Sequence, residues 1–282
     1  MPGPWTLRAL QADKLEQLRP ATLFGVENKV AVVTGAGGGL GAWLSAGLAA
    51  AGAKVFLTDH PRSPTAETAA IIREWGGTVH EHACDLTSED ASERIIADAV
   101  AAFGTVDILV NNAGTNRREP IFDVSRATWD LISTVDLRVP YELSRAAAKV
   151  MSDRGKGGSI VQIGSLTNAI GLEGVSVYGA HKAALCQLAK TMAIEWARYD
   201  VRVNAICPGF MLTPLSKPLW DDPQKGTWIH DRSLLRRPGY PDELIGCLLL
   251  LASQAGSFIT GQTMYVEGGW LAGTPWTESR IA

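Results

Sequence analysis

Short runs of apolar and β-branched residues alternate with longer helix-forming stretches along most of the chain. The run from Val30 to Val33 has no polar position, which is typical of a strand buried on both faces of a parallel sheet. Strands are predicted at 29–34, 54–59, 78–82, 107–111, 158–164, 201–206 and 263–266. Helices are predicted at 42–51, 65–75, 88–103, 125–150, 175–199 and 241–253. This alternation predicts an α/β fold in which crossover helices join parallel strands.

A glycine-rich turn lies between the first predicted strand and the helix that follows it. The residues of this turn that we assign to a cofactor are Gly35, Gly38, Gly39, Leu40 and Gly41. This order of elements places phosphate oxygens against the N-terminal amides of a helix, and side chains there would hold a pyrophosphate off the backbone. A glycine cluster alone also makes a flexible turn, but its position between strand and helix favours a nucleotide site.

The second predicted strand ends in Asp59, eighteen residues after Gly41. A carboxylate at this position can accept hydrogen bonds from both ribose hydroxyls of the adenosine, and it would repel a 2′-phosphate. Asp59 therefore predicts NAD in preference to NADP. Two observations leave this open: Arg62 lies close by, and Asp59 could simply cap the next turn.

Tyr178 and Lys182 are four residues apart in a predicted helix, so they share one face, and Ser165 precedes them by thirteen residues. A tyrosine ionises near pH ~10, and a neighbouring cation favours its phenolate. A hydroxyl beside it can hold the oxygen of an alcohol or a carbonyl. The same Tyr/Lys spacing also occurs by chance on solvated helix faces, so the assignment depends on the accompanying motifs.

Taken in order, these motifs resemble the short-chain dehydrogenase/reductase family over roughly residues 25–272. The resemblance implies a single-domain doubly wound Rossmann fold with a seven-stranded parallel sheet, and hydride transfer between an alcohol and a ketone. It implies that Tyr178 is the base, that Ser165 holds the reacting oxygen, and that Lys182 assists Tyr178 and holds the nicotinamide ribose. The further cofactor-binding residues that it implies are Asp85, Leu86, Asn112, Ala113, Gly114, Pro208, Gly209, Met211 and Thr213.

One position departs from the family pattern. The family usually has an asparagine in the helix after Asn112-Ala113-Gly114, where it binds a water that links the catalytic lysine to solvent, and this chain has Asp136 there. A carboxylate can hold water and pair with Lys182, but its charge disfavours the phenolate. We therefore count Asp136 among the catalytic residues and expect a working relay with a higher pH optimum.

The closest resemblance within the family is to the gluconate 5-dehydrogenase and 2-deoxy-gluconate 3-dehydrogenase branch, which implies a sugar acid or polyol substrate. Arg117 lies at the rim of the expected site, and an arginine can bind a carboxylate through two hydrogen bonds. Residues 213–237 are basic, aromatic and interrupted by prolines, and we expect them to form a substrate lid. Solvated charges on an irregular loop are the alternative. A 3-oxoacyl-thioester reductase and an inactive cofactor-binding regulator remain alternative functions.

Composition narrows the functional classes. The 282 residues can bury one large core, and a net charge of −3 gives no general attraction to nucleic acid or to an anionic membrane. The longest apolar runs are too short to span a bilayer. The four cysteines lack the paired spacing of a metal site or a disulfide framework, so we expect no metal and a cytoplasmic protein.

The domain organisation follows from these assignments. We expect an N-terminal arm over 1–27, a Rossmann dehydrogenase domain over 28–272 and a C-terminal tail over 273–282 that could reach a neighbouring subunit. A short amphipathic helix is predicted between Trp5 and Leu18, and the arm is expected to pack on its own subunit or on another. The family resemblance implies a homotetramer or homodimer.

Overall fold

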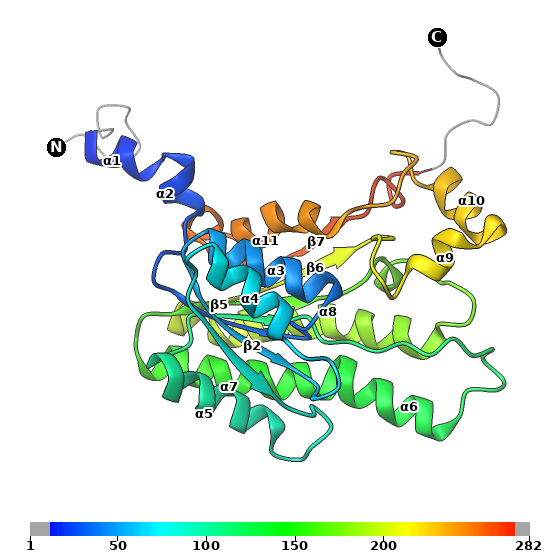
Figure 1. The fold of residues 1–282 in the computed structure, drawn as a ribbon, viewed down its shortest axis with the longest axis horizontal. Helices are drawn as coiled ribbons and strands as arrows, with labels where there is room; N and C mark the ends of the chain where they lie inside the picture. Colours follow the sequence, from blue (N-terminus) through cyan, green and yellow to red (C-terminus); the bar gives the residue numbers. More distant parts are fainter. Residues whose placement is uncertain (1–11, 274–282) are drawn as a thin grey trace, which may run out of the picture.

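The structure, a computed structural model, describes residues 12–273, and within that range one seven-stranded parallel sheet forms the centre (Figure 1). The strands are β1 (Val30–Thr34), β2 (Lys54–Asp59), β3 (Val79–Ala83), β4 (Ile108–Asn111), β5 (Gly158–Ile163), β6 (Val201–Pro208) and β7 (Thr263–Val266). Their order is β3-β2-β1-β4-β5-β6-β7, so the direction of strand addition reverses between β1 and β4. Ligands of such sheets bind at this reversal, beyond the carboxyl ends of the strands. The predicted fold class is confirmed.

Helices cover both faces of the sheet (Figure 1). One layer contains α3 (Gly39–Ala50), α4 (Ala66–Glu74) and α11 (Ile245–Ala252), and the other contains α5 (Ala91–Phe103), α7 (Val139–Asp153) and α8 (Ser176–Trp196). Successive residues of a strand point to opposite faces, so Val32 packs in one core and Val33 in the other. Burial on both faces explains why the strands contain so few polar residues.

The predicted continuous helix at 125–150 is wrong in one respect. It consists of α6 (Arg126–Ser133), a π-helical turn (Thr134–Arg138) and α7. Pro140 has no amide hydrogen, and in a regular α-helix its ring would press on the carbonyl of residue 136. The helix widens at this point, and the amide of Val139 donates to the carbonyl of Thr134, five residues back.

The segment predicted as a lid contains two short helices, α9 (Lys217–Asp221) and α10 (Pro223–Arg232). Each has a proline in its first turn, where no amide hydrogen is required. The Asp222 carboxylate caps α10 by accepting hydrogen bonds from the amides of Gln224 and Lys225. The predicted helix at 241–253 also differs, because it begins as a 3₁₀ turn (Pro241–Leu244) that leads into α11.

The described part of the N-terminal arm consists of α1 (Ala12–Gln17) and α2 (Pro20–Phe24), which project from one end of the sheet (Figure 1). Leu15 and Leu18 stay about half exposed, so packing of this arm on another subunit remains a prediction. The first half of the predicted amphipathic helix and the predicted C-terminal contact lie outside the described residues. Within 12–273, no helix has the length and apolar content needed to cross a membrane.

Candidate active site

Tyr178 and Lys182 lie in the first two turns of α8, at the carboxyl edge of the sheet. The Lys182 ammonium lies 5.6 Å from the centroid of the Tyr178 ring, on the same helix face. Lys182 is 3% exposed, and its Nζ donates to the carbonyl of Ile163 at the end of β5 at 2.9 Å. The backbone of the neighbouring strand therefore fixes the position of the ammonium beside the phenol.

Asp136 forms an ion pair with the same ammonium. Its Oδ1 lies 3.1 Å from Lys182 Nζ, and its Oδ2 accepts a hydrogen bond of 3.0 Å from the amide of Thr115. The side chain is fully buried. Gly114 runs beside the pair, and a β-carbon there would lie 2.8 Å from Asp136 Oδ1, so only glycine fits. The π-helical turn thus brings a carboxylate directly onto the lysine.

The charges of the two neighbours act on the pKa of Tyr178 in opposite directions. Burial of the phenol raises the pKa most and the Asp136 carboxylate raises it further, while Lys182 and the Ser165 hydroxyl lower it. The net pKa lies above the usual tyrosine value. Burial is the largest single influence on the pKa of Lys182 and lowers it, but the charge and hydrogen bond of Asp136 and the charges of Tyr178 and Cys186 together raise that pKa above its usual value. The raised pKa of Lys182 favours its charged form, whereas the raised pKa of Tyr178 disfavours its phenolate.

Ser165 begins the loop after β5, and its extended backbone turns into a short 3₁₀ helix (Leu166–Asn168). The Ser165 hydroxyl accepts a hydrogen bond from the amide of Thr167 at 3.2 Å. This bond leaves the hydroxyl proton free to be donated. Since its hydroxyl also acts on the pKa of Tyr178, the structure brings Ser165, Tyr178 and Lys182 together.

The glycine turn fits a dinucleotide pyrophosphate. Gly39, where α3 begins, has a φ of +53°, and a β-carbon on Gly38 or Gly39 would meet nothing within 4 Å. A β-carbon on Gly41 would overlap the carbonyl oxygen of Gly35, so that glycine is needed for close packing of helix and strand. Leu40 packs its partly buried side chain on the core beneath. Open space above the N-terminus of a helix is the arrangement that binds phosphate.

The turn after β4 is hydrogen-bonded to the glycine turn and holds it in place. Asn112 donates its side-chain amide to the carbonyls of Thr34 and Gly35, at 2.9 and 3.1 Å. The amides of Asn112 and Ala113 donate to the Thr34 hydroxyl, at 3.1 and 3.0 Å. The Asn112 side chain therefore supports the glycine turn from the protein side.

Asp59 lies at the end of β2 beside the glycine turn. Its Oδ2 accepts a hydrogen bond of 2.7 Å from the amide of Gly37, and its Oδ1 accepts one of 2.6 Å from the amide of His60. A carboxylate oxygen accepts more than one hydrogen bond, so ribose hydroxyls can still be bound. Arg62 is exposed and, among the described residues, forms no ion pair. Asp59 thus both shapes the turn and offers acceptors to an adenosine.

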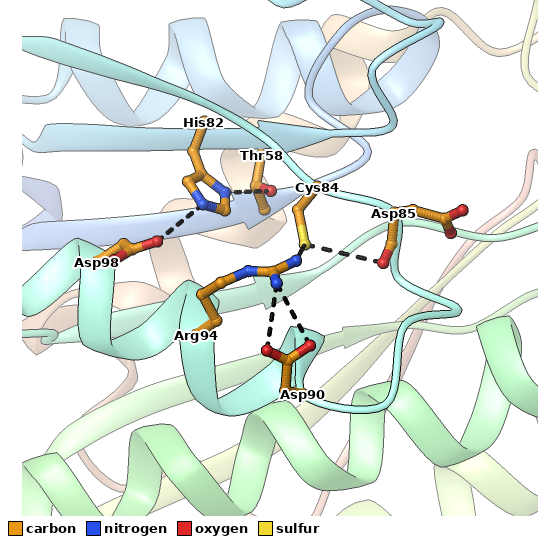
Figure 2. Close-up of polar contacts among 7 residues, drawn as sticks. All are labelled: Thr58, His82, Cys84, Asp85, Asp90, Arg94 and Asp98. Carbon is orange, nitrogen blue, oxygen red and sulfur yellow. Dashed lines mark hydrogen bonds and ion pairs between the residues drawn. The ribbon is translucent and has the colours of Figure 1, made fainter.

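The end of β3 carries the residues assigned to the adenine side, Asp85 and Leu86. The Thr87 amide and hydroxyl bond Asp85 Oδ1 at 2.9 and 2.7 Å, and these bonds keep the pKa of Asp85 below its usual value. Figure 2 shows the supporting contact: Arg94 on α5 donates to Cys84 Sγ at 3.1 Å while also bonding Asp90. Arg94 therefore ties the turn after β3 to α5.

The remaining cofactor candidates follow β6. A β-carbon on Gly209 would lie 2.7 Å from the Glu267 backbone, so a larger residue does not fit there. Met211 is buried, and Thr213 turns the chain toward α9 by accepting a bond from the Ser216 amide at 3.3 Å. These four residues thus connect the sheet edge to the lid segment, from Pro208, the last residue of β6, to Thr213, the first residue of the lid.

Arg117 lies on the loop that follows Gly114. Two residues further on, the Glu119 amide donates to the carbonyl of Gly174 at 3.1 Å, which joins this loop to the one just before Tyr178. Arg117 and Arg118 are exposed and, within residues 12–273, neither forms an ion pair. The rim of the site therefore carries two uncompensated guanidinium groups.

Two contacts of the site were not predictable from residue types, because the backbone makes them. These are the carbonyl of Ile163, which accepts from Lys182, and the amide of Thr115, which donates to Asp136. The Thr34 hydroxyl that holds the turn after β4 did have a sequence signal, since Thr34 immediately precedes the glycine turn.

Comparison with known proteins identifies relatives of this chain. A family model described as Enoyl-(Acyl carrier protein) reductase matches residues 35–271. The 2-dehydro-3-deoxy-D-gluconate 5-dehydrogenase of Escherichia coli (strain K12) is 39% identical over 249 residues, covering 88% of this chain and 98% of that protein.

Two solved structures are also similar. A gluconate 5-dehydrogenase from Burkholderia cenocepacia J2315, in complex with NADP and tartrate, superposes with a TM-score of 0.86 at 33% identity, covering 91% of this chain and all of that one. A 3-oxoacyl (acyl-carrier-protein) reductase from Agrobacterium tumefaciens C58 with NADP bound has a TM-score of 0.85 at 32% identity, covering 90% and 98%.

Fold, site and relatives define an oxidoreductase that uses a nicotinamide cofactor and acts on CH–OH groups. The chain belongs to the short-chain dehydrogenase/reductase family. An inactive regulator is disfavoured, because Ser165, Tyr178 and Lys182 are assembled around one point.

Proposed function

We propose that this enzyme transfers hydride between a secondary alcohol of a sugar acid and the corresponding ketone, with NAD as its preferred cofactor. The proposed reaction is supported mainly by the positions of the Lys182 ammonium and the Ser165 hydroxyl next to Tyr178. The cofactor supplies the acceptor for the hydride. The chain supplies the proton acceptor and the groups that orient the alcohol.

In this proposal, the substrate hydroxyl binds between Ser165 and Tyr178. Tyr178 Oη takes the hydroxyl proton as the C–H bond gives up its hydride, and Ser165 donates a hydrogen bond to the oxygen that becomes the carbonyl. Lys182 stabilises the phenolate, and the buried Asp136 keeps Lys182 protonated. The same groups serve ketone reduction, in which Tyr178 returns the proton.

A carboxylate on the substrate is supported by the charges at the rim. Arg117 and Arg118 are exposed and form no ion pairs within the described chain. The lid lysine Lys217, by contrast, is already paired with Asp221. The similar Burkholderia enzyme was solved with tartrate, a hydroxy acid, and both dehydrogenase relatives act on sugar acids by name. Arg117 is our candidate for a bidentate contact with the substrate carboxylate.

The preference for NAD is supported by Asp59. A carboxylate at the end of β2 favours ribose hydroxyls and repels a 2′-phosphate. Two solved relatives hold NADP, so the ratio of kcat/KM for NAD and NADP is the measurement that tests this preference.

The test is an absorbance assay of NADH formation with gluconate, 2-deoxygluconate, neutral polyols and 3-hydroxyacyl thioesters. We expect turnover with at least one sugar acid and a kcat/KM for it above that of the matching neutral polyol. Arg117→Ala should lower kcat/KM for the acid about 10–100-fold, the value of a charge-assisted contact, and leave the polyol unchanged. Arg126→Ala, on the exposed side of α6, is the matched control. Preference for the thioester would overturn the sugar-acid assignment.

The thioester alternative has one observation in its favour, the similarity to the Agrobacterium 3-oxoacyl reductase. The same substrate panel separates the two functions.

We also propose a cytoplasmic homo-oligomer, either a tetramer or a dimer. The four free cysteines are compatible with a reducing compartment. Ile194 and Phe258 are 80% and 103% exposed, which supports an interface that covers apolar surface. Residues 213–237 are proposed to close over the substrate within the 28–272 domain. A monomer in light scattering would contradict the assembly.

A further inference from the structure

Two cysteines that are 21 residues apart in the chain meet behind the catalytic residues. Cys186 lies on α8, one turn after Lys182, and Cys207 lies near the end of β6. Their sulfur atoms are 3.5 Å apart, and the side chains are 5% and 0% exposed. Because the two cysteines are separated by 21 residues in the sequence, no short spacing motif predicted that they would meet. The absence of paired spacing in the sequence therefore did not exclude a pair of adjacent thiols in the fold.

Polar groups surround both sulfurs. The Asn168 side-chain amide donates to Cys186 Sγ at 3.1 Å and lies 3.5 Å from Cys207 Sγ. Asn168 is itself held by the Tyr265 hydroxyl, which donates to Asn168 Oδ1 at 2.8 Å. Two donors aimed at sulfur, the Asn168 amide and the Cys207 thiol, stabilise a thiolate on Cys186.

The hydrogen bond between the two sulfurs shifts the pKa values of the two thiols in opposite directions. The hydrogen bond from Cys207 lowers the pKa of Cys186 most, with help from Asn168 and the Lys182 charge, to about 7. The hydrogen bond to Cys186 and burial raise the pKa of Cys207. Of the two thiols, Cys186 therefore loses its proton more readily and Cys207 keeps it, so Cys186 is the sulfur that more easily becomes a thiolate, the nucleophilic form.

Cys186, unlike Cys207, borders a cavity of about 380 Å³. Gln187, Lys190, Thr263 and Tyr265 also line this cavity, and Gln187, Lys190 and Tyr265 are exposed to solvent. A water molecule occupies about 30 Å³, so a molecule the size of hydrogen peroxide fits this cavity easily. The reactive sulfur thus faces the side from which a small oxidant can arrive.

We propose that Cys186 and Cys207 form an oxidant-reactive dithiol site that closes to a reversible disulfide and lowers the turnover of hydride transfer. The Cys186 thiolate attacks one oxygen of a peroxide, the O–O bond breaks, and hydroxide leaves with a proton as water. Cys207 sulfur then attacks the sulfenic sulfur, the S–S bond forms, the S–O bond breaks, and a second water leaves. Two thiols lose two hydrogens, and one peroxide is reduced to two waters.

The Cys186–Cys207 disulfide would alter the active site because it forms next to Gly164, the residue before Ser165. A disulfide bond is about 2.0 Å long, so the sulfurs must move roughly 1.5 Å closer than they are in the reduced pair. Gly164, the residue before Ser165, lies directly against them: a β-carbon there would be 2.5 Å from Cys207 Sγ and 3.0 Å from Cys186 Sγ. Closing the bond pulls α8 and its Tyr178 toward β6 and withdraws the thiolate from Asn168.

The test treats the reduced full-length enzyme with hydrogen peroxide and measures intact mass, a peptide map under non-reducing conditions, and turnover. We expect a loss of two hydrogen atoms, a cross-linked peptide joining Cys186 to Cys207, and a kcat that falls about 10–100-fold, as for a displacement near 1 Å at a reaction centre. Dithiothreitol should restore both mass and activity. The turnover measurement rests on the proposed function, but the mass and peptide measurements do not.

Matched variants separate the pair from the other thiols. Cys186→Ser should lose both the bridge and the inactivation, while Cys247→Ser, on α11, should keep both. If Cys186→Ser does not fold, the wild-type peptide map still decides the site. Four intact thiols after peroxide, a bridge that involves Cys84 or Cys247, or a Cys186–Cys207 bridge with unchanged turnover would each overturn the proposal.

Discussion

Lys182 and Asp136 form a buried ion pair in which 3.1 Å separate the ammonium nitrogen from a carboxylate oxygen. Each partner fixes the other, since neither is solvated enough to be charged alone. The family pattern has a neutral asparagine at this position, so the carboxylate places one additional negative charge next to the phenol of Tyr178, the proposed base. The Asp136 carboxylate raises the pKa of Lys182 and also raises the pKa of Tyr178, so it opposes the effect of the Lys182 cation on the phenol.

Replacing Asp136 by asparagine should move the pH dependence of alcohol oxidation toward lower pH. Asp136 raises the pKa of Tyr178, and oxidation requires the phenolate, so activity rises as pH increases through that pKa. With the carboxylate removed, the rise occurs at lower pH. The plateau kcat should change less than about tenfold, because an amide can keep the Thr115 contact.

The measurement is kcat/KM for the oxidation reaction across the pH range of stability. Asp130→Asn is the matched control, because Asp130 is an exposed carboxylate paired with Arg126 on the preceding helix. An unmoved profile in Asp136→Asn would show that this charge does not reach the phenol.

Tyr178→Phe should abolish proton transfer and leave the cofactor site intact. A general base contributes about 10²–10⁴-fold to rate, so kcat should fall by that amount. NADH binding, followed by fluorescence, should weaken little, since the hydroxyl is not part of the glycine turn. Tyr141→Phe on the exposed face of α7 serves as control. Near-normal turnover of Tyr178→Phe would eliminate the assigned base.

A pair of glycine variants separates cofactor contact from packing. Gly38→Ala adds a methyl group that meets no protein atom within 4 Å, so the melting temperature should hold while NADH affinity falls about tenfold or more through contact with the pyrophosphate. Gly41→Ala forces a methyl group onto the Gly35 carbonyl, which should cost about 1–3 kcal/mol of unfolding free energy. Calorimetry and NADH titration distinguish the two. Equal changes in melting temperature and NADH affinity in both variants would contradict a pyrophosphate site at the glycine turn.

Asp59→Asn should shift cofactor selectivity toward NADP. The variant loses the charge that repels a 2′-phosphate and weakens a charge-assisted contact, so the NAD-to-NADP ratio of kcat/KM should fall about 10–100-fold. Asp153→Asn, which removes an exposed carboxylate that pairs with Lys149 at the end of α7, controls for loss of one charge. A wild-type enzyme that already prefers NADP would refute the role given to Asp59.

The sheet and its ligand edge were predictable because their causes are local in sequence. The run Val30–Val33 is buried on both faces, so it contains no polar residue, and Gly41 is required by close packing against Gly35. Tyr178 and Lys182 were predictable as a pair since helical spacing alone puts them on one face.

Other features depend on contacts that residue types do not encode. The carbonyl of Ile163 and the amide of Thr115 belong to every residue, and their selection requires the folded chain. Cys186 and Cys207 meet only because α8 packs on β6. The lid helices had a signal in Asp222 and the two first-turn prolines, but short helices with exposed, basic surfaces show no apolar periodicity.

The wide turn at Thr134–Arg138 makes this catalytic centre depend on chain length as well as on chemistry. One residue of a helix corresponds to a rotation of about 100°, so deleting a single amino acid anywhere in the turn would swing Asp136 away from its lysine. Point substitutions do not change the direction in which residue 136 projects from the helix axis. A substitution at position 136 therefore preserves the backbone geometry of the site, whereas a deletion beside it does not.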